Sequence, residues 1–112
     1  MNNMPVSVRE ALKEVGIQVV VKEDMYFGDD YGEHDEYPGR YHGYYMRYKG
    51  VHVAAIGIVN GKIHYEGVDR YTDDGDFVMN PIVELGSWND VLANAIATTT
   101  LMRMNGQFET NN

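Results

Sequence analysis

The sequence contains no cysteine. Disulfide bonds, thiolate metal sites and cysteine nucleophiles are therefore excluded. It also lacks an uncharged apolar run near the roughly 20 residues that a membrane-spanning helix needs. The first residues, MNNMPVSVRE, have neither the basic nor the apolar region of a signal peptide. We therefore expect a soluble, cytoplasmic protein.

Basic residues are scarce in this chain. Lys and Arg total 9 against 17 Asp and Glu, which gives a formal net charge of −8 at pH 7. Such a field repels phosphate backbones and anionic membranes and favours basic partners. The composition therefore predicts neither direct nucleic-acid binding nor membrane binding.

The 112 residues predict a single α+β domain spanning residues 1–112. A short helix is expected over 6–16, with a capping box at Ser7 and Glu10, a hydrophobic staple between Val6 and Ala11, and Gly16 at its end. A longer helix is expected from Ser87, with a capping box to Asp90, to Gly106. The last residues, 107–112, are expected to fray.

Between the helices the pattern predicts an antiparallel meander of four to five strands. The first strand begins at residue 17, and an acidic loop over about 23–39 follows it. Strands over 40–48, 51–59, 62–71 and 76–80 are separated by turns at Lys49-Gly50, Asn60-Gly61 and Asp74-Gly75. Both helices are expected on one face, which makes a two-layer fold.

Two-residue turns fix a predicted register in this sheet. Ile58 then opposes Ile63, Ile56 opposes Tyr65 and Ala54 opposes Tyr45, all facing the helices. The second face collects an apolar and tyrosine surface that two helices cannot cover, typical of a protein interface. As an oligomer interface we predict Tyr44, Met46, Val53 and Val59. In the alternatives, the acidic loop covers this face, or the register slips by one residue.

The acidic loop is also a candidate cation site. Oxygen ligands at Asp29, Asp30, Glu33, Asp35 and Glu36, with His34, suit Ca²⁺ or Mg²⁺. Their spacing matches no EF-hand loop, and solvated loop charge is the commoner explanation of such a cluster. We therefore predict no metal and no cofactor. The nine tyrosines suggest RNA stacking over 40–48, but the net charge opposes it.

Catalytic motifs are absent from the sequence. There is no G-x-S-x-G, P-loop, Rossmann fingerprint or H-E-x-x-H. In the predicted register His52 and His64 point to opposite faces, and one strand separates His42 from His64. The alternatives to a binding protein are a small metal-dependent hydrolase or other enzyme using His, Asp and Glu, and a homo-oligomeric structural protein.

The leading hypothesis is a non-enzymatic acidic protein that occludes a basic or nucleic-acid-binding partner protein. Carboxylates along the loop and in the 69–76 turn would present charge as a phosphate backbone does, and tyrosines would anchor the contact. In charge, size and lack of cysteine the chain is similar to the antirestriction and anti-CRISPR inhibitors that phages make, although no motif supports the likeness. The predicted contacts are Asp29, Asp30, Tyr31, Glu33, Asp35, Glu36, Tyr37, Tyr44 and Tyr48.

Overall fold

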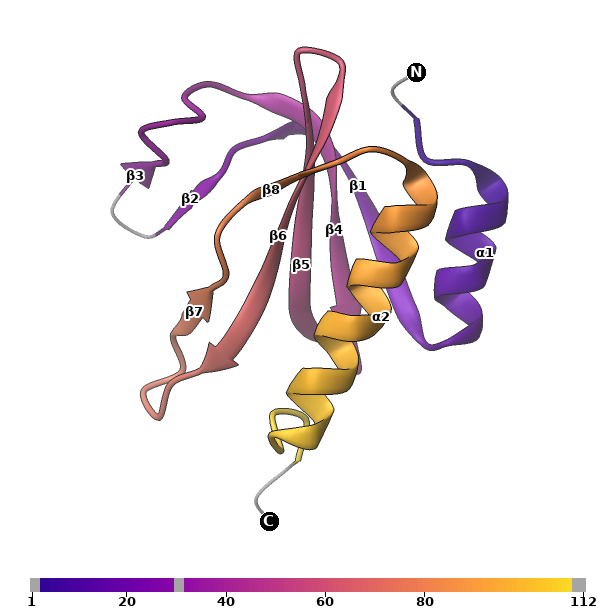
Figure 1. The fold of residues 1–112 in the computed structure, drawn as a ribbon. Coiled ribbons are helices and arrows are strands. Elements are labelled where there is room, and N and C mark those ends of the chain that lie inside the picture. The colour runs from indigo at the N-terminus through magenta and orange to yellow at the C-terminus, as the bar shows by residue number, and fades with distance from the viewer. Residues whose placement is uncertain (1–2, 30–31, 110–112) are drawn as a thin grey trace.

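The computed structural model describes residues 3–29 and 32–109 and shows an α+β fold (Figure 1). Its helices are α1 (Val6–Glu14) and α2 (Trp88–Met104). Its strands are β1 (Ile17–Met25), β2 (Gly28–Asp29), β3 (Gly32–Glu33), β4 (Tyr41–Tyr48), β5 (Val51–Val59), β6 (Lys62–Tyr71), β7 (Phe77–Met79) and β8 (Val83–Leu85).

The main sheet is antiparallel, in the order β1-β4-β5-β6-β7. Strand β8 also pairs with β6, opposite Ile63–Tyr65. Strands β2 and β3 form a separate small hairpin within the acidic segment. The predicted fold class is confirmed. The sequence pattern did not predict β2, β3 or β8, which are only two or three residues long.

The central hairpin has the predicted turn. Asn60 and Gly61 have φ values of 53° and 75°, as the two central residues of a type I′ turn require. The register between β5 and β6 follows from it, with Ile58 opposite Ile63 and Ile56 opposite Tyr65. This part of the predicted register is confirmed.

Both helices pack on one face of the sheet, and they also pack on each other (Figure 1). Helix α2 begins as predicted, since the Asp90 backbone N–H donates a 3.2 Å hydrogen bond to Ser87 Oγ. Its buried stripe consists of Trp88, Val91, Ala95, Thr99 and Met102. All of these except the polar Thr99 belong to the main hydrophobic core, together with Leu12 of α1 and Ile56 of β5.

Helix α1 starts two residues earlier than a capping box at Ser7 would allow. Pro5 is the N-cap residue, and its carbonyl accepts the backbone N–H groups of Val8 and Arg9 at 3.1 Å each. No side chain caps the helix, and Val6 is 74% exposed. The predicted capping box and hydrophobic staple are therefore wrong, because proline fixes the extended-to-helix transition without a side-chain bond.

A β-bulge overturns the predicted register of β4. Tyr48 opposes Val51 and Arg47 opposes His52, but Met46 then opposes Ala54, which leaves Val53 as an extra residue in β5. Tyr45 consequently opposes Ala55 rather than Ala54. One inserted residue moves every earlier side chain of β4 to the other face of the sheet.

The predicted oligomer interface is corrected by this bulge. Tyr44, Met46 and Val53 are buried in the core beneath the helices, and Tyr48 packs against the same core. Of the predicted set, only Val59 packs with residues on the second face. The surface predicted from Tyr44, Met46, Val53 and Val59 therefore does not exist as one exposed patch.

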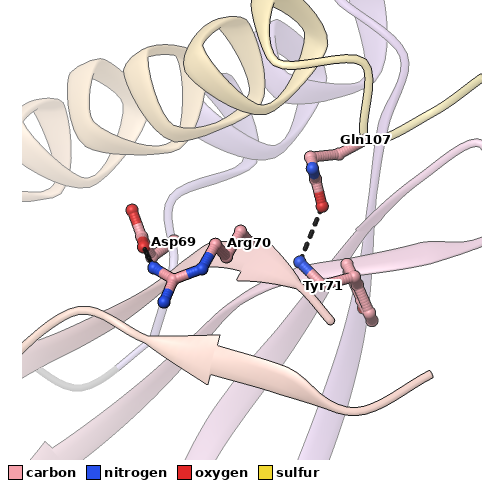
Figure 2. Close-up of polar contacts among 4 residues, drawn as sticks. All are labelled: Asp69, Arg70, Tyr71 and Gln107. Carbon is pink, nitrogen blue, oxygen red and sulfur yellow. Dashed lines mark hydrogen bonds and ion pairs between the residues drawn. The ribbon is translucent and has the colours of Figure 1, made fainter. Parts of the chain in front are cut away.

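The chain after α2 packs on the sheet. Gly106, with φ of 73°, ends the helix as predicted. The Tyr71 backbone N–H donates a 2.6 Å hydrogen bond to Gln107 Oε1, beside the ion pair of Asp69 and Arg70 (Figure 2). The Phe108 ring lies 4.8 Å from the Tyr48 ring. Residues 107 and 108 are thus held in place rather than frayed, and residues 110–112 lie outside the described residues.

Candidate functional site

The acidic segment itself covers the part of the second sheet face that lies toward the Asn60-Gly61 turn, which we call the upper part. Met25 and Phe27 are each only 1% exposed, and they pack with Ala55 and Val59 in a second core. The sequence analysis left open whether this segment covers the second face. For this part of the face it does.

A cross-strand pair of glycines makes room for these two side chains. Gly43 of β4 lies directly opposite Gly57 of β5. A Cβ atom on Gly57 would lie 2.7 Å from Phe27 Cε2, and one on Gly43 would lie 2.9 Å from Met25 Sδ. Met25 and Phe27 therefore pack directly on the backbone of β4 and β5. Residues with a Cβ atom at positions 43 and 57 would not permit such a close approach.

Aromatic contacts place the second half of the acidic segment, after the β2–β3 hairpin, on the same face of the sheet. The Tyr37 ring lies 5.8 Å from Phe27 and 5.2 Å from His64. The His34 backbone N–H donates a 2.6 Å hydrogen bond to the Phe27 carbonyl, and the Tyr37 N–H donates one of 3.1 Å to the His34 carbonyl. These contacts order the backbone on both sides of the β2–β3 hairpin.

The beginning and the end of the acidic segment also contact each other. Arg40 lies 4.0 Å above the Tyr26 ring, and its Nε is 3.8 Å from Asp24 Oδ1. The Tyr41 hydroxyl donates a hydrogen bond to the Pro38 carbonyl. The described parts of the predicted acidic loop, residues 23–29 and 32–39, therefore form a folded lobe, which we call the acidic lobe.

The part of the second face toward the Lys49-Gly50 turn, which we call the lower part, remains accessible. The Tyr45 ring lies 5.4 Å from His52, and His52 lies 5.7 Å from the 41% exposed Phe77. The half-buried Glu66 lies on the neighbouring strand, on the far side of Ala55 from Tyr45. The bulge is the reason that Tyr45 and His52 both lie on this face.

Burial changes the titration of the groups on this lower part. It raises the pKa of Glu66 to about 7. Burial also raises the pKa of Tyr45, and the nearby Tyr26 and Glu66 raise it further. Burial lowers the pKa of His52, and the charge of Arg47 lowers it further. Glu66 is thus the carboxyl group here that changes charge near neutral pH.

Replacing Glu66 with glutamine is expected to stabilise the protein at alkaline pH. The folded-state pKa of about 7 exceeds the ordinary value of 4.5, so ionised Glu66 opposes folding, and this cost grows as pH rises from 4.5 to 7. Since the side chain is only half-buried, we expect Glu66→Gln to add about 1 kcal/mol to the free energy of unfolding at pH 8 and almost nothing at pH 4. Urea unfolding at both pH values tests this. The control is Glu10→Gln, at an exposed position. An equal gain in the free energy of unfolding in the two variants would contradict the raised pKa of Glu66.

Two groups of acidic side chains are exposed. Asp35 and Glu36 lie in the part of the lobe between β3 and β4, and Asp73, Asp74 and Asp76 lie in the turn between β6 and β7. Of the predicted contacts, Asp30 and Tyr31 lie outside the described residues, and for Asp29 and Glu33 only the backbone in β2 and β3 is described. These two acidic groups stand on the opposite side of the view from the helices (Figure 1).

The predicted tyrosine contacts are largely inside the protein. Tyr37 is half-buried between Phe27 and His64, Tyr44 is buried under α2 against Trp88, and Tyr48 lies between Phe108 and Arg103. On the accessible part of the second face the aromatic residues are instead the half-buried Tyr45 and the exposed Phe77, neither of which sequence reasoning selected. For the covered part of the face, the signal in the sequence was a glycine in each of two neighbouring predicted strands, Gly43 and Gly57, because glycine within a strand often marks a close approach to its backbone.

The histidines do not converge. His42 contacts Tyr44 on the helix side, at 5.4 Å between ring centres, while His52 and His64 both lie on the second face. The prediction that His52 and His64 face opposite ways is therefore wrong, again because of the bulge. Within 3–29 and 32–109, no three His, Asp or Glu side chains are grouped closely enough to hold a metal ion.

Two further findings concern the chain as a whole. Neither α1 nor α2 is long and apolar enough to cross a membrane. Comparison with protein-family models, with curated proteins and with solved structures finds no match to this chain.

Proposed function

We propose that the protein is a non-enzymatic binding protein that occludes a basic surface, such as the nucleic-acid-binding surface of a partner protein. The observation that carries the proposal is the division of side chains within the acidic lobe. Met25, Phe27 and Tyr37 are anchored on the sheet, while Asp35 and Glu36 remain in solvent. The lobe thereby holds these two carboxylates toward solvent.

A second acidic group supports the same proposal. Asp73, Asp74 and Asp76 are exposed in the β6–β7 turn, where the Thr72 hydroxyl donates hydrogen bonds to Asp74 Oδ1 and, at 3.1 Å, to the Asp76 carbonyl. Carboxylates fixed at two places present a negative potential over an extended surface, which steers a basic partner and fixes its orientation. Tyr45 and Phe77 supply apolar contact on the accessible part of the second face.

Removing charge from the two acidic groups is expected to weaken partner binding about tenfold. Each exposed ion pair contributes up to about 1 kcal/mol, so three lost carboxylates together account for such a change. The test variant combines Asp35→Asn, Glu36→Gln and Asp73→Asn. A control variant of equal charge combines Glu10→Gln, Glu14→Gln and Glu109→Gln, all exposed and outside the two groups.

The experiment is capture of partners from host lysates by the immobilised protein at about 0.05 M and 0.3 M salt, followed by titration of the captured protein. We expect a basic partner that duplex DNA displaces, and whose affinity falls with salt and in the test variant only. A partner whose affinity ignores salt, or that both variants weaken equally, would contradict the charge-based part of the proposal. Failure to capture any partner would contradict the proposal as a whole.

A further inference from the structure

Strand β1 is an uncovered edge of the main sheet. It pairs with β4 along one edge, and no strand in the described part of the chain pairs with the other (Figure 1). Val21 is 43% exposed on this strand, and Val19 and Val20 are half-buried. An edge strand of this kind presents backbone N–H and C=O groups that another strand can pair.

The two ends of this edge carry opposite charges on the helix side. A groove of about 510 Å³ between α1 and the first half of β1 is lined by Arg9, Lys13 and residues 16–20. At the other end of the strand, the exposed Glu23 lies on the same side of the sheet as Met4 and Tyr44, in a hollow that Arg9 also lines. Neither Lys13 nor Glu23 forms an ion pair with another described residue.

We propose that two copies of this chain pair through β1 in antiparallel fashion, which joins their sheets into one. A two-fold axis at Val20 places Val19 of one copy opposite Val21 of the other, and Ile17 opposite Glu23. Residues directly opposite in an antiparallel pair point to the same face. Glu23 of each copy therefore enters the groove beside Lys13 of the other, twice in the dimer.

This register matches the chemistry of the strand at each position. Val19 and Val21 contact on the helix side, the two Val20 side chains meet on the second face, and Gln18 lies opposite Lys22. No two like charges are opposed between residues 17 and 23. The repulsion between two copies that each carry −8 acts over longer distances, and physiological salt screens it with a Debye length of about 8 Å.

Cysteine cross-linking tests the register directly, since the natural chain has no cysteine. Opposed residues in an antiparallel pair have Cα atoms about 4.5–5.5 Å apart, within reach of a disulfide. We expect Val20→Cys to form a covalent dimer under mild oxidation. Gln18→Cys should not do so, because the two copies of residue 18 lie about 13 Å apart along the strands. Equal dimer formation by the two variants would contradict the proposal.

Charge exchange tests the predicted ion pair by sedimentation equilibrium, as a function of protein concentration. We expect wild-type protein to dimerise reversibly, Glu23→Lys to weaken the dimer about tenfold, and Lys13→Glu combined with Glu23→Lys to restore it to within about twofold. A wild type that stays monomeric, or a double variant as weak as Glu23→Lys, would overturn the proposal. Neither measurement involves a basic partner, so the proposed function stands or falls separately.

Discussion

Replacing Gly43 with alanine is expected to lower the free energy of unfolding by about 3 kcal/mol. A Cβ atom at this position would lie 2.1 Å from the Ile56 carbonyl oxygen and 2.9 Å from Met25 Cγ. The Ile56 oxygen belongs to the backbone of the central strand, so it cannot move aside as the end of a side chain can. Both the β4–β5 pairing and the packing of Met25 would have to change.

Urea unfolding of Gly43→Ala measures this effect, and Gly86→Ala is its control. A Cβ atom on Gly86 has only Asp90 Oδ2 near it, at 3.7 Å, which is ordinary van der Waals contact. We expect the control to differ from wild type by less than about 1 kcal/mol. Equal stability of the two variants would show that Gly43 is not closely approached.

Truncation of Phe27 is expected to have the largest effect on the acidic lobe. The ring is 1% exposed and packs on Gly57, Tyr37 and Tyr41. Phe27→Ala should therefore cost about 3–4 kcal/mol of unfolding free energy. It should also detach the lobe, because the Phe27 ring is the group that packs Tyr37 and Tyr41 against the Gly57 backbone, and alanine removes these contacts.

Urea unfolding together with limited proteolysis within residues 28–40 tests this prediction. Phe77→Ala is the matched control, because Phe77 is also aromatic but 41% exposed, and we expect it to cost about 1 kcal/mol. If Phe27→Ala were no more susceptible to cleavage in the lobe than Phe77→Ala, the anchoring role of Phe27 would be refuted.

Local signals were sufficient to predict most of the fold. Asn60-Gly61 determined both a turn type and the β5–β6 register, because only a few residues adopt positive φ at two successive positions. Ser87 marked the start of α2 for a similar reason, since a hydroxyl there satisfies a helix N–H. In both cases the cause lies within a few residues of the effect.

The candidate site was harder to predict because its determinants are not local. The bulge at Val53 depends on how β4 and β5 pack together, and nothing near Val53 in the sequence marks it. It reversed the faces of Tyr44 and Met46 and brought Tyr45 beside His52. The folding of the acidic segment depends on Phe27 meeting Gly57, which lies 30 residues further along the chain. Charge predicted that the carboxylates are exposed, but not that a buried aromatic cluster orients them.

The central claim is that Phe27 fixes the acidic lobe on the glycine pair of the sheet, and the most direct test is a nuclear Overhauser measurement between the Phe27 ring and the α-protons of Gly57. The account predicts strong cross-peaks, since Phe27 Cε2 lies 2.7 Å from the place where a Gly57 Cβ would be. Absence of these cross-peaks, with ring-proton shifts typical of an unfolded chain, would contradict it.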